Sequence, residues 1–267
     1  MVLLTMDRWL IAWQLSATSL GYYSIGVMAS NLLALVPTSA ANVLYPKMLE
    51  QFALTHNPSA VALYLFNPLR AIAALMVLLV GMSTIFIPEV IILLLPKYNS
   101  SIPLIEILIP GAYLLSFTHI AGNYVITINR QNLLVMIQLT SICIGLIVDA
   151  TLIYYGYGIY GIAYGTICCY AIYGLGYFSI ALYLAGEKPI KIILAITEIL
   201  ILFIFTIIGI AITKYYFITS LDWKIHLFKV VSKLIIYASV VLPVIWLINR
   251  KSGLLASTNA TFFKSRY

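Results

Sequence analysis

The sequence predicts an all-α protein, a polytopic bundle of membrane helices with about seven full transmembrane spans and a partial helix at its N-terminus. Of the 267 residues, 63% are hydrophobic and only 9% are charged, and the mean hydropathy is +1.05. Soluble globular domains contain about 45–50% apolar and about 25% charged residues. The composition therefore excludes an ordinary soluble domain.

The first element is an apolar segment that carries Asp7 and Arg8 inside it, with no basic region ahead. This order of residues differs from that of a cleavable signal peptide. We interpret the segment as the end of a helix, and we expect sequence upstream of Met1 to be missing from this chain.

Seven apolar runs follow, and each is long enough to cross the hydrocarbon core of a bilayer, which needs about 20 residues per helix. Residues typical of turns separate these runs, among them Pro46, Pro88, Asn129, Gly156 and Gly186. The connections leave no room for a separate extramembrane domain. The predicted spans, in order, are residues 23–45, 69–88, 104–128, 133–154, 159–184, 192–213 and 231–248.

The distribution of Lys and Arg predicts the orientation of the bundle, because cytoplasmic loops are enriched in both residues. One set of alternate loops, with the C-terminal tail, holds nine of them, and the opposite set holds five. We therefore predict that the first set and the C-terminus are cytoplasmic. The nine are Lys47, Arg70, Arg130, Lys188, Lys191, Arg250, Lys251, Lys264 and Arg266, and the five are Lys97, Lys214, Lys224, Lys229 and Lys233.

Several classes of function are disfavoured by the sequence. The net charge of +7 is sparse and scattered, unlike the dense basic face of a nucleic-acid-binding protein. Cys143, Cys168 and Cys169 lie in apolar runs and fit neither a metal site nor a disulfide framework. No catalytic motif is present, so we expect no catalytic residues, no metal, no cofactor and no enzyme activity.

Ionisable residues at membrane depth are the first candidates for a site, since charge there costs at least about 2.5–3.5 kcal/mol per residue. Arg8 can bind a phosphate bidentately, with Asp7 beside it, or can simply reach the interface. Asp149 lies toward the outer third of its span. It is a candidate for ion coupling through a bound proton, or alternatively caps the turn near Tyr154.

Two pairs of uncharged polar residues are candidate substrate-binding residues. His119 and Asn123 are four residues apart and share one face of the third span. Tyr173 and Tyr177 have the same spacing in the fifth span. Each pair can line a cavity and contact sugar hydroxyls, or can bond to a neighbouring helix.

Gly158, Gly161 and Gly165 form a third feature of that fifth span. Small residues at this spacing allow a neighbouring helix to approach closely in a membrane. We predict that the three glycines share one packing face.

The order of several motifs resembles the second half of bacterial polysaccharide flippases of the Wzx type, in the MATE-like MOP superfamily. The motifs are Asp7-Arg8-Trp-Leu-Ile-Ala-Trp13, Leu20-Gly-Tyr-Tyr-Ser-Ile25, Leu44-Tyr-Pro-Lys-Met48, the stretches Pro88 to Tyr98 and Ile105 to Gly111, the turn at Asn123 to Arg130, and the Gly- and Tyr-rich run Tyr154 to Thr166. The resemblance covers about residues 7–185. It implies a MATE-like C-terminal lobe for residues 1–185. Residues 186–267 match the family only in hydropathy, and we predict that they form two additional transmembrane helices and a short basic cytoplasmic tail.

The same resemblance implies the function and the partners. It implies an inner-membrane transporter that moves an undecaprenyl-diphosphate-linked oligosaccharide across the bilayer by alternating access, for polysaccharide or O-antigen biosynthesis. Its partners are then this lipid-linked substrate, membrane lipids and an N-terminal lobe or second chain, with no nucleic acid. The alternatives are a MATE-like ion-coupled drug exporter, an integral-membrane sugar polymerase or acyltransferase, and a structural membrane subunit.

Overall fold

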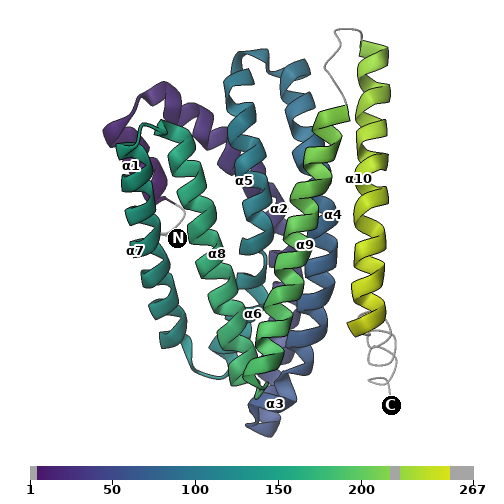
Figure 1. Cartoon of the computed structure of the whole chain (residues 1–267). Helices are drawn as coiled ribbons and strands as arrows, with labels where there is room; N and C mark the ends of the chain where they lie inside the picture. The colour runs from purple at the N-terminus through teal and green to yellow at the C-terminus, as the bar shows by residue number, and fades with distance from the viewer. Residues whose placement is uncertain (1–4, 217–222, 253–267) are drawn as a thin grey trace.

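The computed structural model describes residues 5–216 and 223–252, and within these residues every regular element is a helix (Figure 1). The predicted all-α class is therefore confirmed. The elements in chain order are α1 (Met6–Gln14), α2 (Ala17–Thr55), α3 (Pro58–Val61), α4 (Leu63–Leu94), the 3-10 helix η2 (Pro96–Ser101), α5 (Ile102–Leu115), α6 (Phe117–Thr127), α7 (Gln131–Tyr154), α8 (Gly158–Leu184), α9 (Pro189–Tyr216) and α10 (Trp223–Ser252).

Seven helical segments in the described part of the chain are long and apolar enough to cross a membrane. Each contains all or nearly all of one predicted span, so the predicted number is confirmed. The chain is a multi-pass membrane protein. The segments are Ala17–Thr55, Pro58–Leu94, Pro96–Thr127, Gln131–Tyr154, Gly158–Leu184, Pro189–Lys214 and Val230–Leu247.

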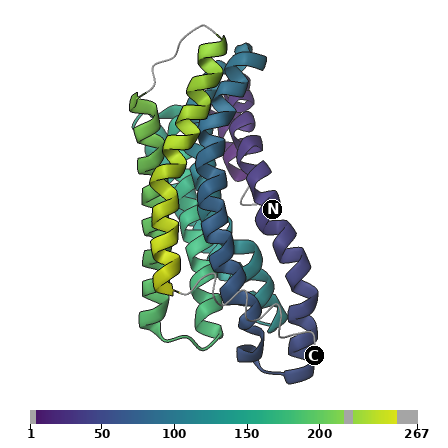
Figure 2. The same ribbon diagram turned by 90° about the vertical axis from the view of Figure 1, so that its right-hand side faces the viewer.

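Successive spans run in opposite directions along one bundle, as Figures 1 and 2 show from two sides. The segment made by α5 and α6 lies at the centre, in contact with α2, α4 and α8. Tyr113, Phe117 and Tyr124 from this segment are fully buried. The Tyr113 ring stacks on Phe203 of α9, and the Phe117 ring meets Phe178 of α8 edge-on.

Two predicted helix ends are wrong. Helix α2 continues through Pro37 and Pro46, and α4 continues through Pro88. Lipid offers no hydrogen-bond partner for free backbone groups, and transmembrane helices therefore tolerate proline where neighbouring helices and side chains compensate. Pro46 and Pro88 are residues inside helices and do not form turns.

Other predicted turns are confirmed by their backbone conformations. Asn129 lies between α6 and α7 with φ of 59°, in the left-handed region that asparagine tolerates. Gly156 and Gly186 have φ of 83° and 88° and end α7 and α8. At the start of α3, the Asn57 side chain accepts a hydrogen bond from the Ser59 amide at 3.0 Å.

The short helix α1 occupies the position of the predicted partial helix. It ends at Gln14, and α2 begins directly after Ser16, whose hydroxyl accepts a hydrogen bond from the Ser19 amide. Ile11 is fully buried against α2 and α8, whereas Trp9 and Trp13 are largely exposed. Helix α1 therefore packs on the bundle along one narrow side (Figure 1).

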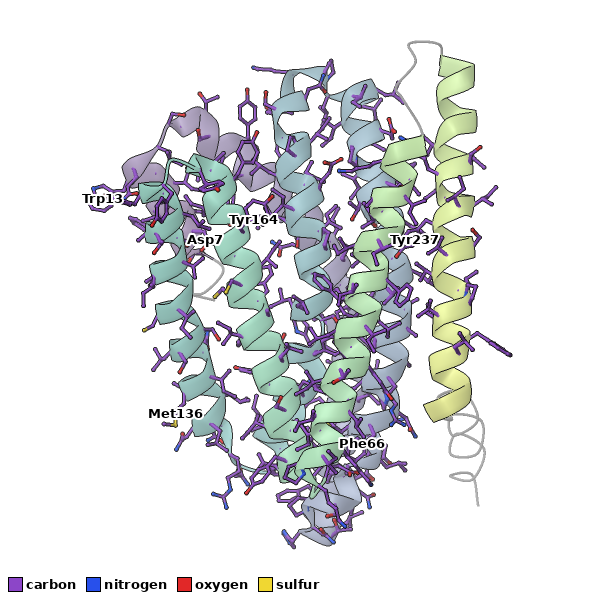
Figure 3. All side chains as sticks on the ribbon, viewed as in Figure 1. Asp7, Trp13, Phe66, Met136, Tyr164 and Tyr237 are labelled. Atoms are coloured by element: carbon purple, nitrogen blue, oxygen red, sulfur yellow. The ribbon has the colours of Figure 1, made fainter. Side chains whose placement is uncertain are left out.

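The last two spans, α9 and α10, pack against each other and against α4. Tyr237 of α10 is fully buried, and its hydroxyl donates to the Val77 carbonyl oxygen of α4 at 2.6 Å (Figure 3). Its ring lies over Gly81 and Gly209, so that a β-carbon at Gly81 would overlap the ring. Because Gly81 and Gly209 have no β-carbon, the Tyr237 ring fits between α4, α9 and α10.

Among the described residues, two ion pairs join α10 to α4 and α9 to α5. Lys233 Nζ lies 2.7 Å from Glu89 Oε1, and these side chains are 15% and 8% exposed. Lys214 Nζ pairs with Glu106 Oε2 at 2.6 Å, with 51% and 26% exposure. The predicted basic tail beyond Ser252 lies outside the described residues.

Candidate functional site

A buried group of oxygen atoms joins α1 to two spans. Asp7 Oδ2 lies 2.8 Å from the Tyr23 hydroxyl of α2 and 2.8 Å from the Thr166 hydroxyl of α8. The two hydroxyl oxygens are 2.7 Å apart. Tyr23 is 0% exposed and Thr166 is 2% exposed. We call Asp7, Tyr23 and Thr166 the oxygen cluster.

The oxygen cluster has fewer hydrogen atoms than its contacts require. Thr166 Oγ1 also lies 2.8 Å from the Ile162 carbonyl oxygen, which gives four short oxygen–oxygen contacts in all. Each hydroxyl supplies one hydrogen. Two hydrogens therefore serve four contacts, and an added proton or a metal cation would supply the missing positive charge.

Asp149 of α7 borders this cluster. Its side chain is 2% exposed, and a carboxyl oxygen occupies the place that a β-carbon at Gly165 would take. Its Oδ1 atom has no hydrogen-bond partner among the described residues. Gly165 precedes Thr166 in the chain, and the charge of Asp7 acts on Asp149. The predicted alternative, in which Asp149 caps the turn near Tyr154, is not observed in this part of the chain.

Arg8, the neighbour of Asp7, is only partly exposed. Its Nε atom is buried and donates to no acceptor within the described residues. A guanidinium has five N–H donors and no acceptor, so a buried Nε without a partner can still take a carboxylate or phosphate oxygen. Arg8 is thus the cation nearest to the oxygen cluster along the chain.

The predicted pair His119 and Asn123 faces α2 and does not join the oxygen cluster. The His119 Nε2 atom lies 3.4 Å from the Thr38 hydroxyl. The Asn123 amide donates to the Ala41 carbonyl oxygen at 3.2 Å. Both side chains therefore bond to a neighbouring helix, the second of the two alternatives considered for this pair.

The second predicted pair lies further along α8. The rings of Tyr173 and Tyr177 are 4.4 Å apart between centroids and meet edge to face. Tyr177 is buried, and a β-carbon at Gly122 of α6 would lie 3.3 Å from its ring. Seven residues separate Tyr173 from Thr166, about 10 Å along the helix. The tyrosine pair therefore packs α8 on α6, away from the oxygen cluster.

The glycine face of α8 is smaller than predicted. A β-carbon at Gly161 would lie 2.8 Å from Leu152 of α7, and Gly165 meets Asp149 of the same helix. Gly158 has open space around its β-carbon position and φ of 54°. Including Gly158 in the packing face is wrong, because this residue belongs to the turn that begins α8.

Sequence reasoning missed two members of the oxygen cluster. Tyr23 is 16 residues from Asp7, and Thr166 is 159 residues from it. The one local signal is that Thr166 directly follows the small-residue motif Gly161 to Gly165, where a hydroxyl faces a closely packed helix. Tyr23 carries no comparable signal among 20 tyrosines.

We found no protein-family model, no curated protein and no solved structure that matches this chain. In the described part of the chain, no group of three or more His, Cys, Asp or Glu side chains could hold a metal ion. The oxygen cluster combines one carboxyl group with two hydroxyls and is therefore not a group of this kind.

Proposed function

We propose that this chain belongs to a membrane transporter that moves an undecaprenyl-diphosphate-linked oligosaccharide across the bacterial inner membrane by alternating access. We further propose that a proton or monovalent cation binds at the oxygen cluster and drives the transport. The observation that carries the coupling is the buried, hydrogen-poor contact of Asp7 with Tyr23 and Thr166. Ionisable groups buried among transmembrane helices are costly, and they commonly mark ion pathways.

The arrangement of the cluster supports coupling to a conformational change. Its three side chains come from α1, α2 and α8, and Asp149 adds a carboxyl group from α7. A cation held between several helices stabilises the conformation in which these helices approach one another. Loss of the cation leaves Asp7 and Asp149 to repel each other and favours their separation.

The nature of the substrate rests on the resemblance of residues 7–185 to Wzx-type flippases. In that proposal Arg8 contacts the diphosphate. Transport also needs a second lobe, which an N-terminal lobe or a second chain would provide. Charge counting supports a cytoplasmic C-terminus, since the α6–α7 and α8–α9 connections, which contain Arg130 and Lys188, lie at the same end of the bundle as the end of α10.

A MATE-like ion-coupled drug exporter is the second candidate. The observation in its favour is the excess of carboxyl groups at the site, where Asp7 and Asp149 stand against one arginine. The alternative of a sugar polymerase or acyltransferase has less support, since the described residues bring together no nucleophile, base and orienting group.

The test deletes the gene in its own host and restores it as wild type, Asp7→Asn or Glu50→Gln. A glycosidase is then added outside spheroplasts, and the lipid-linked oligosaccharide that it cannot reach is measured. We expect this protected oligosaccharide to accumulate in the deletion strain and in Asp7→Asn. Wild type and Glu50→Gln, which changes an exposed carboxylate of α2 by the same charge, should relieve it.

Three results would decide against the proposal. An unchanged oligosaccharide pool in the deletion strain removes the flippase function. Greater sensitivity to cationic drugs with an unchanged pool favours the exporter. Altered polymer length or acylation without accumulation favours the enzyme.

A further inference from the structure

A second feature lies at the opposite end of the bundle from the oxygen cluster. A cavity of about 360 Å³ opens between α4, α6, α8, α9 and α10. Most of its wall is apolar and includes Phe66, Phe117, Phe178 and Leu202. Small-molecule pockets have volumes of about 300–1,000 Å³ and mainly apolar walls. The cavity is therefore of ligand size.

Four charged side chains complete this wall, two of each sign. Arg70 comes from α4, Glu187 from the α8–α9 connection, and Lys191 and Glu198 from α9. Lys191 Nζ pairs with Glu187 Oε2 at 3.1 Å, and the lysine is 65% exposed. Glu198 makes no ion pair or hydrogen bond with any described residue and is only partly exposed. The wall thus offers cations and carboxylates together.

The position of the cavity matches the head-group level of a membrane. Arg70 lies in the second turn of α4, and Lys191 lies in the first turn of α9, so both are close to helix ends. Phe178 is 12 residues beyond Thr166, about 18 Å along α8. Figure 3 shows Phe66 near the lower end of the bundle and Asp7 in its upper half. The cavity is separate from the oxygen cluster.

We propose that this cavity binds one zwitterionic membrane phospholipid whose head group carries a primary ammonium, as in phosphatidylethanolamine. Arg70 and Lys191 contact the phosphate, Lys191 keeps its ion pair with Glu187, and Glu198 accepts a hydrogen bond from the ammonium. The apolar wall covers the glycerol and the first part of the acyl chains. The rest of the chains lies along the exposed apolar surface of α9, which includes Ile201 and Ile204.

The balance of charge selects this head group over two others. A purely anionic head group would meet two carboxylates that repel it and gains no partner for them. A choline head group has no N–H donor, so Glu198 would lose its charge-assisted hydrogen bond. The ethanolamine head group is the common membrane head group that satisfies both signs.

The proposal is tested by lipid retention on the full chain. The chain is purified in a mild detergent and mixed with equal amounts of phosphatidylethanolamine, phosphatidylcholine and phosphatidylglycerol that carry identical acyl chains. Native mass spectrometry then measures the lipid bound to each chain. We expect one phosphatidylethanolamine per chain, retained about tenfold better than phosphatidylcholine, the factor that one charge-assisted hydrogen bond provides. Equal retention of the three lipids, preference for phosphatidylglycerol, or no retained lipid overturns the proposal.

Variants locate the site within the chain. Glu198→Gln should lower the preference for phosphatidylethanolamine over phosphatidylcholine by about tenfold. Arg70→Ala should lower retention of both, because both carry a phosphate. Arg130→Ala removes the same charge at the same end of the bundle, outside the cavity. It should change neither the retention of the two lipids nor the preference between them. Equal losses of lipid retention in Arg130→Ala and Arg70→Ala would contradict the site. The comparison of the three lipids on the wild-type chain still tests the proposal where a variant does not fold.

Discussion

Removal of Lys233 tests how α10 is held on α4. In the structure its ammonium lies 2.7 Å from Glu89 Oε1, and the Glu89 side chain is only 8% exposed. The second carboxylate oxygen, Oε2, is also buried. Lys233→Met therefore removes from this buried carboxylate the ammonium group that lies against Oε1.

The expected size of the effect follows from burial. Breaking one partner of a buried ion pair costs about 3–5 kcal/mol of unfolding free energy, whereas replacing both partners by apolar residues is often neutral or stabilising. We expect Lys233→Met to lower the unfolding free energy by about 3–5 kcal/mol. The double variant Glu89→Leu with Lys233→Met should recover most of this unfolding free energy. The pair Glu106 and Lys214 is a matched control, since it is 26% and 51% exposed and should contribute about 1 kcal/mol or less.

The assay is reversible unfolding of the purified chain in mixed micelles, with an increasing fraction of denaturing detergent. The double variant must be compared with both single variants under the same conditions. A loss below about 1 kcal/mol for Lys233→Met, or equal losses for Lys233→Met and Lys214→Met, would refute the argument that burial sets the cost.

The remaining predictions concern a glycine of α8 and two residues of α1. Gly165→Leu should prevent folding or lower membrane abundance, because Asp149 already occupies the space beside the glycine. Gly21→Ala should be tolerated in the same abundance assay, because nothing lies within 4 Å of its β-carbon position. Arg8→Lys should impair polysaccharide assembly nearly as much as Arg8→Ala if the planar guanidinium binds a diphosphate; full complementation by the lysine variant would remove Arg8 from the substrate site. Asp7→Asn should abolish the dependence of transport on the coupling cation, measured across cation gradients in proteoliposomes, and an unchanged dependence would contradict the coupling role.

The spans were predictable because hydropathy alone determines which segments can enter lipid. The positions of helix ends were less so, since Pro46 and Pro88 lie in helices that continue where neighbouring helices satisfy the backbone. Asn129 and Gly186 ended helices as predicted, because their left-handed conformations are a local property.

The candidate site was predictable only in part. Asp7 and Asp149 stood out because carboxyl groups are rare in apolar runs. Their neighbours Tyr23 and Thr166 did not stand out, since helix packing brings them to Asp7 from distant parts of the chain. The Glu89–Lys233 pair was missed for the same reason, with 144 residues between its members.

Helix α1 is attached to the bundle by few contacts, and its tryptophans make its position observable by fluorescence. Ile11 and the hydrogen bonds of Asp7 hold this helix on the bundle, so the proposed cation binding at the oxygen cluster should change the position of α1. Two of the four tryptophans in the chain, Trp9 and Trp13, lie on its exposed side, where Figure 3 shows Trp13 pointing away from the bundle. Displacement of α1 in this mechanism would change the surroundings of both indoles. Unlabelled protein should therefore signal cation binding as a change in tryptophan emission, before any substrate is added.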